Sequence, residues 1–202
     1  MTAAPGSPAS PARGDDALLA VLLEVERHVA GAGWDGPARL FALVRTDQLL
    51  ATEPHLAATL GPSDPDGADA ARANAAGAEA TERPPDALTA IEQEEFSASG
   101  DLLADLARIA WPSAVHGCAV AVERTFLPAG LEAEVPVDPA AAAAYVAAHP
   151  RREDVRVVVG VDRAGHRHGV ARLHSAEQEL LSADDLVPDL AAVLAHTLAE
   201  DA

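Results

Sequence analysis

Residues 151–174 read RREDVRVVVGVDRAGHRHGVARLH, and this stretch decides the fold. Every second residue from Val155 to Val161 is valine, and this period of two predicts a strand over 154–162. Arg163-Ala164-Gly165 then supplies a tight turn, and a second alternating run over 167–174 predicts the returning strand. The stretch therefore predicts a β-hairpin.

A third strand is expected upstream, over 115–126, where small or apolar residues occupy both faces as far as Val122. Burial on both faces is typical of a central strand. Apolar residues at helical spacing predict helices over 15–30, 37–50, 86–96, 101–109, 139–148 and 182–200. Together these elements predict an α+β fold, with a small three-stranded or slightly larger sheet covered by helices and preceded by an N-terminal helical pair.

Two segments are expected to lie outside the folded core. Residues 1–14 consist mainly of Pro, Ala, Gly and Ser, and residues 61–85 contain no large apolar side chain. Such segments bury too little apolar surface to offset the entropy of ordering them. We therefore expect a disordered N-terminal tail at 1–14 and a single α+β domain over 15–202, with a flexible Pro/Ala/Gly-rich insert at about 61–85.

Composition excludes several classes of function. The chain has 32 acidic and 14 basic residues, giving a formal net charge of −18, and it contains no lysine. Schiff-base chemistry, biotinyl or lipoyl carriage and a P-loop all need a lysine, so they are excluded. Because so acidic a surface repels phosphates and anionic lipids, we expect no nucleic-acid partner and no membrane partner.

The single cysteine, Cys118, cannot form an internal disulfide, which fits a reducing compartment. The first residues show no apolar core typical of a signal peptide, and no apolar run approaches the ~18 residues that span a bilayer. We therefore expect a cytoplasmic protein.

Six of the fourteen arginines fall within residues 151–172, with four histidines among or beside them. Strand alternation and hairpin pairing bring part of this cluster to one face, and the candidate anion- or partner-binding residues are Arg156, His166, His168, Arg172 and His174. The cluster could bind a carboxylate, a phosphate or an acidic partner segment. It could equally be a solvated face whose arginines pair with nearby carboxylates, for example Glu123 with Arg156 or Arg172.

Metal binding and catalysis have weaker support. His166, His168 and His174, with His116 or Cys118 on a neighbouring strand, could supply zinc ligands. The interleaved arginines oppose a cation, however, and the sequence has neither a Cys-x-x-Cys nor a His-Glu-x-x-His motif. Cys118 lies in an apolar run typical of an inert packing thiol. We therefore assign no metal ligands, no cofactor and no catalytic residues.

Several segments together resemble a PPA-type family of uncharacterised actinobacterial proteins. They are WDGPARLFALVRTDQLLA (34–51), AIEQEEF (90–96), LARIAWPSAVHGCAVAVERTFLP (106–128), AAHPRREDVRVVVGVDRAGHRHGVARL (147–173) and LVPDLAAVLAHTL (186–198). The most specific features are the patterns WP…GxAxxxER…LP and HP…VRxxxGV. The resemblance implies an actinobacterial source but no reaction, cofactor or partner.

With no catalytic constellation and several apolar stripes beside a small sheet, we expect a non-enzymatic binding or regulatory protein. Its partner would be another protein or a second copy, since sheet edges need cover or pairing. The alternative is a small-molecule enzyme or ligand sensor that binds an anionic ligand on the Arg/His-rich sheet face.

Overall fold

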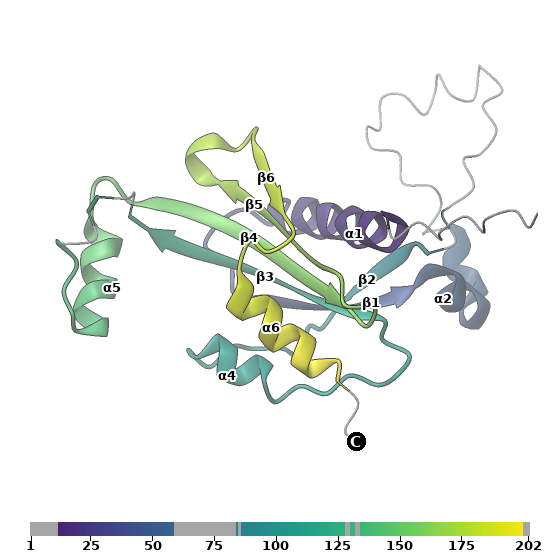
Figure 1. The fold of residues 1–202 in the computed structure, drawn as a ribbon. Helices are drawn as coiled ribbons and strands as arrows, with labels where there is room; N and C mark the ends of the chain where they lie inside the picture. Colours follow the sequence, from purple (N-terminus) through teal and green to yellow (C-terminus); the bar gives the residue numbers. More distant parts are fainter. Residues whose placement is uncertain (1–11, 59–83, 85, 128–129, 132–133, 200–202) are drawn as a thin grey trace, which may run out of the picture.

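The computed structural model describes residues 12–58, 84, 86–127, 130–131 and 134–199. Its strands form one antiparallel six-stranded sheet in the order β2-β1-β3-β4-β5-β6 (Figure 1). The strands are β1 Arg39–Arg45, β2 Leu88–Glu92, β3 Gly117–Phe126, β4 Glu153–Asp162, β5 Arg167–Leu173 and β6 Leu180–Ala183. The helices are α1 Ala12–Ala30, α2 Thr46–Thr52, α4 Leu102–Leu106, α5 Pro139–Ala148 and α6 Pro188–Thr197, with 3-10 turns η1 Pro54–Ala58 and η3 His174–Ala176.

The predicted hairpin and the strand upstream of it are confirmed. β3, β4 and β5 are consecutive neighbours, and Arg156 of β4 lies directly opposite Glu123 of β3 and Arg172 of β5. Val157 and Val159 pack on one face of the sheet, while Val158 packs on the other. The alternation in the sequence therefore assigned the faces of β4 correctly.

The predicted α+β class is right, but the small three-stranded sheet and the N-terminal helical pair are wrong. β1 and β2 replace the helices expected over 37–50 and 86–96, and β6 forms a further edge. In β1, Leu40 and Ala42 face one core while Phe41 and Leu43 face the other. A short apolar run buried on both faces has the same composition in a strand as in a helix, which is why its periodicity was misleading.

A hydrophobic core lies on each face of the sheet, and Figure 1 shows α1 on one face and α4 and α6 on the other. Helix α1 covers one face through Leu18, Leu22, Val25 and Val29. Helices α4 and α6 cover the opposite face through Leu102, Leu106, Leu190 and Leu194. The chain thus has three layers, and the face under α1 carries the charged residues discussed below.

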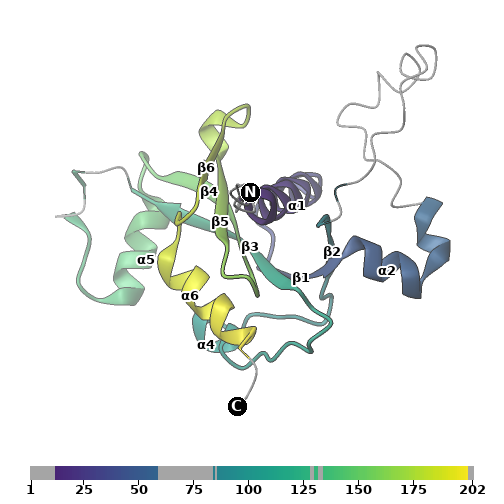
Figure 2. The same cartoon turned by 45° about the vertical axis from the view of Figure 1, so that its right-hand side comes forward.

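Helix α5 lies apart from these layers, at the far ends of β3 and β4, whereas α2 lies at the opposite end of the sheet (Figures 1 and 2). The predicted bounds of α5, 139–148, are those observed. Helix α6 is shorter than predicted because it begins at Pro188, and a proline biases the residue before it toward extended backbone.

Across the described residues, none of the helices combines the length and apolar character that crossing a bilayer would require. The predicted tail falls largely on residues 1–11, and the predicted insert falls almost entirely on 59–83 and 85. Both of these segments lie outside the described residues.

Candidate functional site

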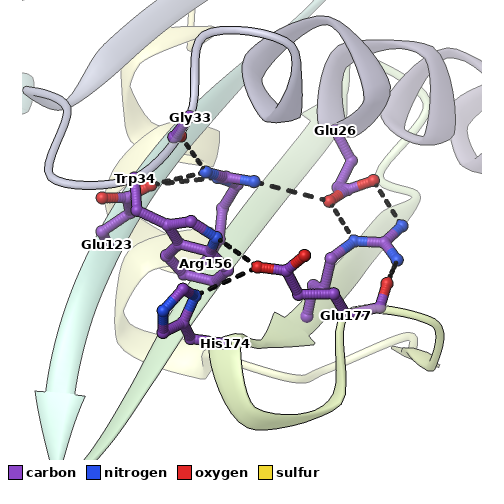
Figure 3. A network of polar contacts seen from close by, with 8 residues as sticks. Glu26, Gly33, Trp34, Glu123, Arg156, His174 and Glu177 are labelled. Atoms are coloured by element: carbon purple, nitrogen blue, oxygen red, sulfur yellow. Dashed lines mark hydrogen bonds and ion pairs between the residues drawn. The ribbon is translucent and has the colours of Figure 1, made fainter.

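The centre of the charged face is Glu26, which α1 presents to the sheet between Arg172 and Arg156 (Figure 3). Glu26 is only 2% exposed. Arg172 donates from Nε and Nη2 to the two carboxylate oxygens of Glu26, at 2.6 and 2.8 Å. Nη1 of Arg156 lies 4.0 Å from Glu26 Oε1. A single carboxylate therefore binds the helix to two neighbouring strands.

Arg156 is 1% exposed, and its guanidinium is surrounded by partners. Its Nε and Nη2 donate to Glu123 Oε1 at 3.1 and 2.8 Å, and Nη2 also donates to the carbonyl of Gly33. The ring of Trp34 stacks on the other side, with its centroid 4.3 Å from Cζ. The predicted Glu123–Arg156 ion pair is thus present, strengthened by a cation–π contact.

Glu177 joins the turn after β5 to the same group (Figure 3). Its Oε1 accepts from Trp34 Nε1 at 3.0 Å and lies 3.2 Å from His174 Nδ1, while its carbonyl accepts from Arg172. The rings of His174 and Trp34 meet edge to face at 4.6 Å. We call Glu26, Glu123, Arg156, Arg172, Trp34, His174 and Glu177 the Arg–Glu network.

The charge balance of the Arg–Glu network is negative, since three carboxylates face two guanidinium groups. The hydrogen bonds that Arg172 donates to Glu26 raise the pKa of Arg172 above its usual value. The contacts of both arginines are made within the chain. The network therefore acts first as a clamp on α1, and anion binding by its arginines stays a prediction.

The five candidate residues do not form one group. Arg156, Arg172 and His174 belong to the Arg–Glu network, whereas His166 closes the β4–β5 turn with Nδ1 2.7 Å from Asp162 Oδ2. His168 faces the first turn of α1. Because His166 and His174 lie at opposite ends of β5, about 25 Å apart, the three imidazoles cannot share one zinc ion.

A cleft of about 320 Å³ opens next to the Arg–Glu network, between the C-terminal end of α1, the ends of β1 and β2, and β3. Most of its lining residues are apolar or glycine: Val29, Ala32, Gly33, Gly36, Pro37, Ala38, Phe96, Ala121 and Val122. The charged lining residues are Arg39, Arg156, Glu92, Glu94 and Glu123. Two ion pairs, Arg39–Glu92 and Arg156–Glu123, account for four of them.

Arg39 and Glu92, which both line the cleft, form a close ion pair. Arg39 donates from Nε and Nη2 to the two carboxylate oxygens of Glu92, at 2.5 and 2.7 Å. These hydrogen bonds lower the pKa of Glu92. Both arginines of the cleft are thus engaged inside the protein, and the remaining surface is largely apolar.

A family model described as PPA1309-like protein matches residues 18–199, a range that contains the cleft and the Arg–Glu network. The chain belongs to the PPA1309-like family. The predicted resemblance is therefore confirmed, while the actinobacterial source stays a prediction. No curated protein and no solved structure matches this family member.

Sequence analysis missed Glu26, although a signal was present. Glu26 follows Leu18 and Leu22 at helical spacing, which places a carboxylate on the stripe of α1 that faces the sheet. A charge at such a position needs a buried partner, and the sequence offers several arginines in the facing strands. Pairing the Glu26 carboxylate with those arginines would have predicted its contact with the sheet.

Cys118 is confirmed as a packing residue, with Sγ 3.6 Å from Thr197 Oγ1 and 3.7 Å from the Leu194 carbonyl. Burial raises the pKa of the thiol to about 11. At pH 8 only about one thiol in a thousand would be ionised, and the thiolate is the reactive form. We expect the native protein to react with a disulfide reagent such as DTNB at least ~100-fold more slowly than free cysteine.

The reaction rate is measured by the absorbance of the thiolate that DTNB releases after it is mixed with the protein at pH 8, with and without denaturant. Unfolding in urea should restore a rate close to that of free cysteine, which serves as the control. Fast reaction of the native chain would contradict the buried position of Cys118.

Proposed function

We propose that this protein is a non-enzymatic, cytoplasmic binding protein whose cleft holds an apolar side chain of another protein chain, either a partner or a second copy. The observation that carries the proposal is the composition of the cleft. Its surface is mainly apolar, and its arginines are occupied by Glu92 and Glu123. Such a surface favours an apolar group over an anion.

The size of the cleft supports an anchoring side chain. Its 320 Å³ is near the lower limit of the ~300–1,000 Å³ typical of small-ligand pockets. Protein interfaces concentrate their binding energy in a few aromatic or aliphatic side chains that fill such hollows, surrounded by a polar rim. Arg39, Glu92 and Glu94 would form that rim.

The position of the cleft favours a polypeptide. Glu92, which ends β2, lines the cleft, and among the residues that the structure describes β2 has a strand neighbour on one side only. An edge strand offers backbone groups to an added chain. A partner segment could therefore bind both to the strand and to the cleft.

The anionic-ligand alternative receives no comparable support. Three carboxylates line the cleft against two guanidinium groups, and the Arg–Glu network has the same excess of negative charge. An anion would have to displace internal carboxylates from both arginines. We therefore retain protein binding as the proposed function.

The substitution Ala32→Trp tests the proposal, since Ala32 is exposed and lines the cleft. An indole there should fill the hollow without disturbing either core. Peptides selected from a phage-displayed random library on the wild-type chain should share an aromatic or aliphatic anchor and lack acidic residues. Their affinity for the variant should fall at least ~10-fold, measured by fluorescence anisotropy, because the anchor loses its hollow.

The matched control is Ala51→Trp, which adds the same side chain to an exposed alanine of α2, outside the cleft lining. It should leave peptide affinity unchanged. Light scattering from 1 to 100 µM separates the two kinds of partner, because a second copy would give a dimer that Ala32→Trp abolishes. A monomeric chain that enriches no peptide, or peptides that bind Ala32→Trp as tightly as wild type, would refute the proposal.

A further inference from the structure

A second group of ligand-type side chains lies at the other end of α1. Asp15 from the first turn of α1, His168 from β5 and Asp184 from the turn after β6 each direct one possible ligand atom to a common point. These atoms all lie within 4.8 Å of one another. Three elements that are remote in sequence therefore meet at one place.

The buried member of the group is His168, which is 7% exposed. Its Nδ1 lies 3.2 Å from Asp184 Oδ1, yet it makes no hydrogen bond of acceptable geometry. A buried polar atom without a partner costs about 1–3 kcal/mol, so such atoms call for an explanation. Nδ1 and the Asp184 carboxylate thus lie close together without the alignment of a hydrogen bond.

The other ring nitrogen of His168 is occupied. Nε2 lies 2.7 Å from Ser182 Oγ, which can accept its hydrogen. That hydrogen bond would place the proton on Nε2 and leave the lone pair of Nδ1 directed toward the two aspartates. Histidines that bind metals commonly donate their second N–H to a neighbouring oxygen in this way, which fixes the tautomer and the ring orientation.

We propose that Asp15, His168 and Asp184 bind a divalent transition-metal ion of the zinc type, with water completing the coordination. One imidazole nitrogen and two carboxylates suit zinc, whereas magnesium and calcium prefer oxygen ligands alone. Tetrahedral zinc holds its ligand atoms about 3.4 Å apart, so the group has to contract by roughly 1 Å. The 3.2 Å between His168 Nδ1 and Asp184 already fits, so the contraction falls on the distances to Asp15, and the 82% exposed side chain of Asp184 can adjust with it.

The ion would link α1 to the β5–β6 edge of the sheet. It neutralises two carboxylates beside a buried imidazole, and it connects the start of α1 to the strands as Glu26 does further along the helix. The site lies about 20 Å along α1 from the cleft, so it is independent of the proposed function. Because only the folded chain assembles the three ligands, the ion should stabilise that state.

The experiment uses tag-free protein treated with EDTA and then dialysed. Calorimetric titration with zinc chloride should show one equivalent bound with a Kd of micromolar or below. The melting temperature should rise by several degrees in excess zinc and stay unchanged in excess magnesium. Absence of stoichiometric zinc binding, or an equal response to magnesium, overturns the proposal.

The chain offers matched controls, since each aspartate of the site has an exposed aspartate as its neighbour, Asp16 and Asp185. Asp15→Asn and Asp184→Asn should each weaken zinc binding at least 10-fold and remove the melting shift. Asp16→Asn and Asp185→Asn should stay within twofold of wild type. Equal losses in both pairs, or no loss in the first pair, would show adventitious binding by surface groups and overturn the proposal. These substitutions avoid the buried His168, so we expect every variant to fold, which the melting curves without zinc check.

Discussion

Glu26→Ala should lower the free energy of unfolding by about 3 kcal/mol, because it removes the carboxylate that Arg172 binds with two hydrogen bonds. In this variant Arg156 would still pair with Glu123, but it would lose its contact with the Glu26 carboxylate of α1. Breaking one partner out of a buried ionic group leaves a charge without compensation, which is more costly than the net value of the pair. Urea unfolding should show the loss directly, and the melting temperature should fall by about 6–12 °C.

Glu95→Ala removes a carboxylate from an exposed position and serves as the control, with a change of no more than ~0.5 kcal/mol. The double variant Glu26→Ala with Arg172→Ala should be less destabilised than the sum of the two single variants, since it removes both charges of the pair. A Glu26→Ala protein as stable as wild type would show that the clamp contributes nothing to holding α1.

Leu22→Ala should cost about 2–5 kcal/mol, because Leu22 is fully buried between α1 and the sheet. Gly160 of β4 lies directly beneath it: a Cβ at this position would come within 2.6 Å of Leu22 Cδ2. Gly160→Ala alone should therefore destabilise by about 1–3 kcal/mol through overpacking. In the double variant the new methyl group occupies space that Leu22 has vacated, so the effects should fall short of additivity by about 1 kcal/mol or more.

Urea unfolding of the four proteins in this cycle measures the coupling. Gly36→Ala is the control for a glycine substitution, since a Cβ there would meet nothing within 4 Å. It should change stability by no more than ~0.5 kcal/mol. If the free-energy changes of Leu22→Ala and Gly160→Ala were strictly additive, this would contradict the packing of Leu22 against Gly160.

Local sequence patterns predicted secondary structure correctly where the pattern is compatible with only one structure. The alternating valines of 155–161, the glycine turn at 163–165 and the returning run over 167–174 predicted β4, β5 and the hairpin. The predicted helix over 139–148 likewise matches α5, and the structure shows the local reason: the Asp138 side chain accepts a hydrogen bond from Ala141 N, and Pro139 stands in the first turn. These features depend only on residues close in sequence.

The pattern was insufficient for β1, β2 and β6. RLFALVR (39–45) carries the same apolar residues that a buried helix would carry, and LTAIE (88–92) places Leu88 and Ile91 at helical spacing. They are strands because each pairs with a neighbour: β1 with β3, β2 with β1, and β6 with β5. Tertiary pairing of this kind overrides local preference.

The functional residues divide in the same way: some follow from the local sequence, and others follow only from tertiary contacts. The amino-acid sequence by itself determined the α+β class and the hairpin, and it limited the partner of Glu123 to Arg156 or Arg172, since each follows from composition or from strand register. Only the tertiary structure decided that Glu26 holds Arg172, that the cleft forms beside them, and that Asp15 and Asp184 meet at His168. The physical reason is that α1 packs across the sheet, so its contacts with β5 join residues more than a hundred positions apart, as in Glu26–Arg172 and Asp15–His168, and no local periodicity specifies them.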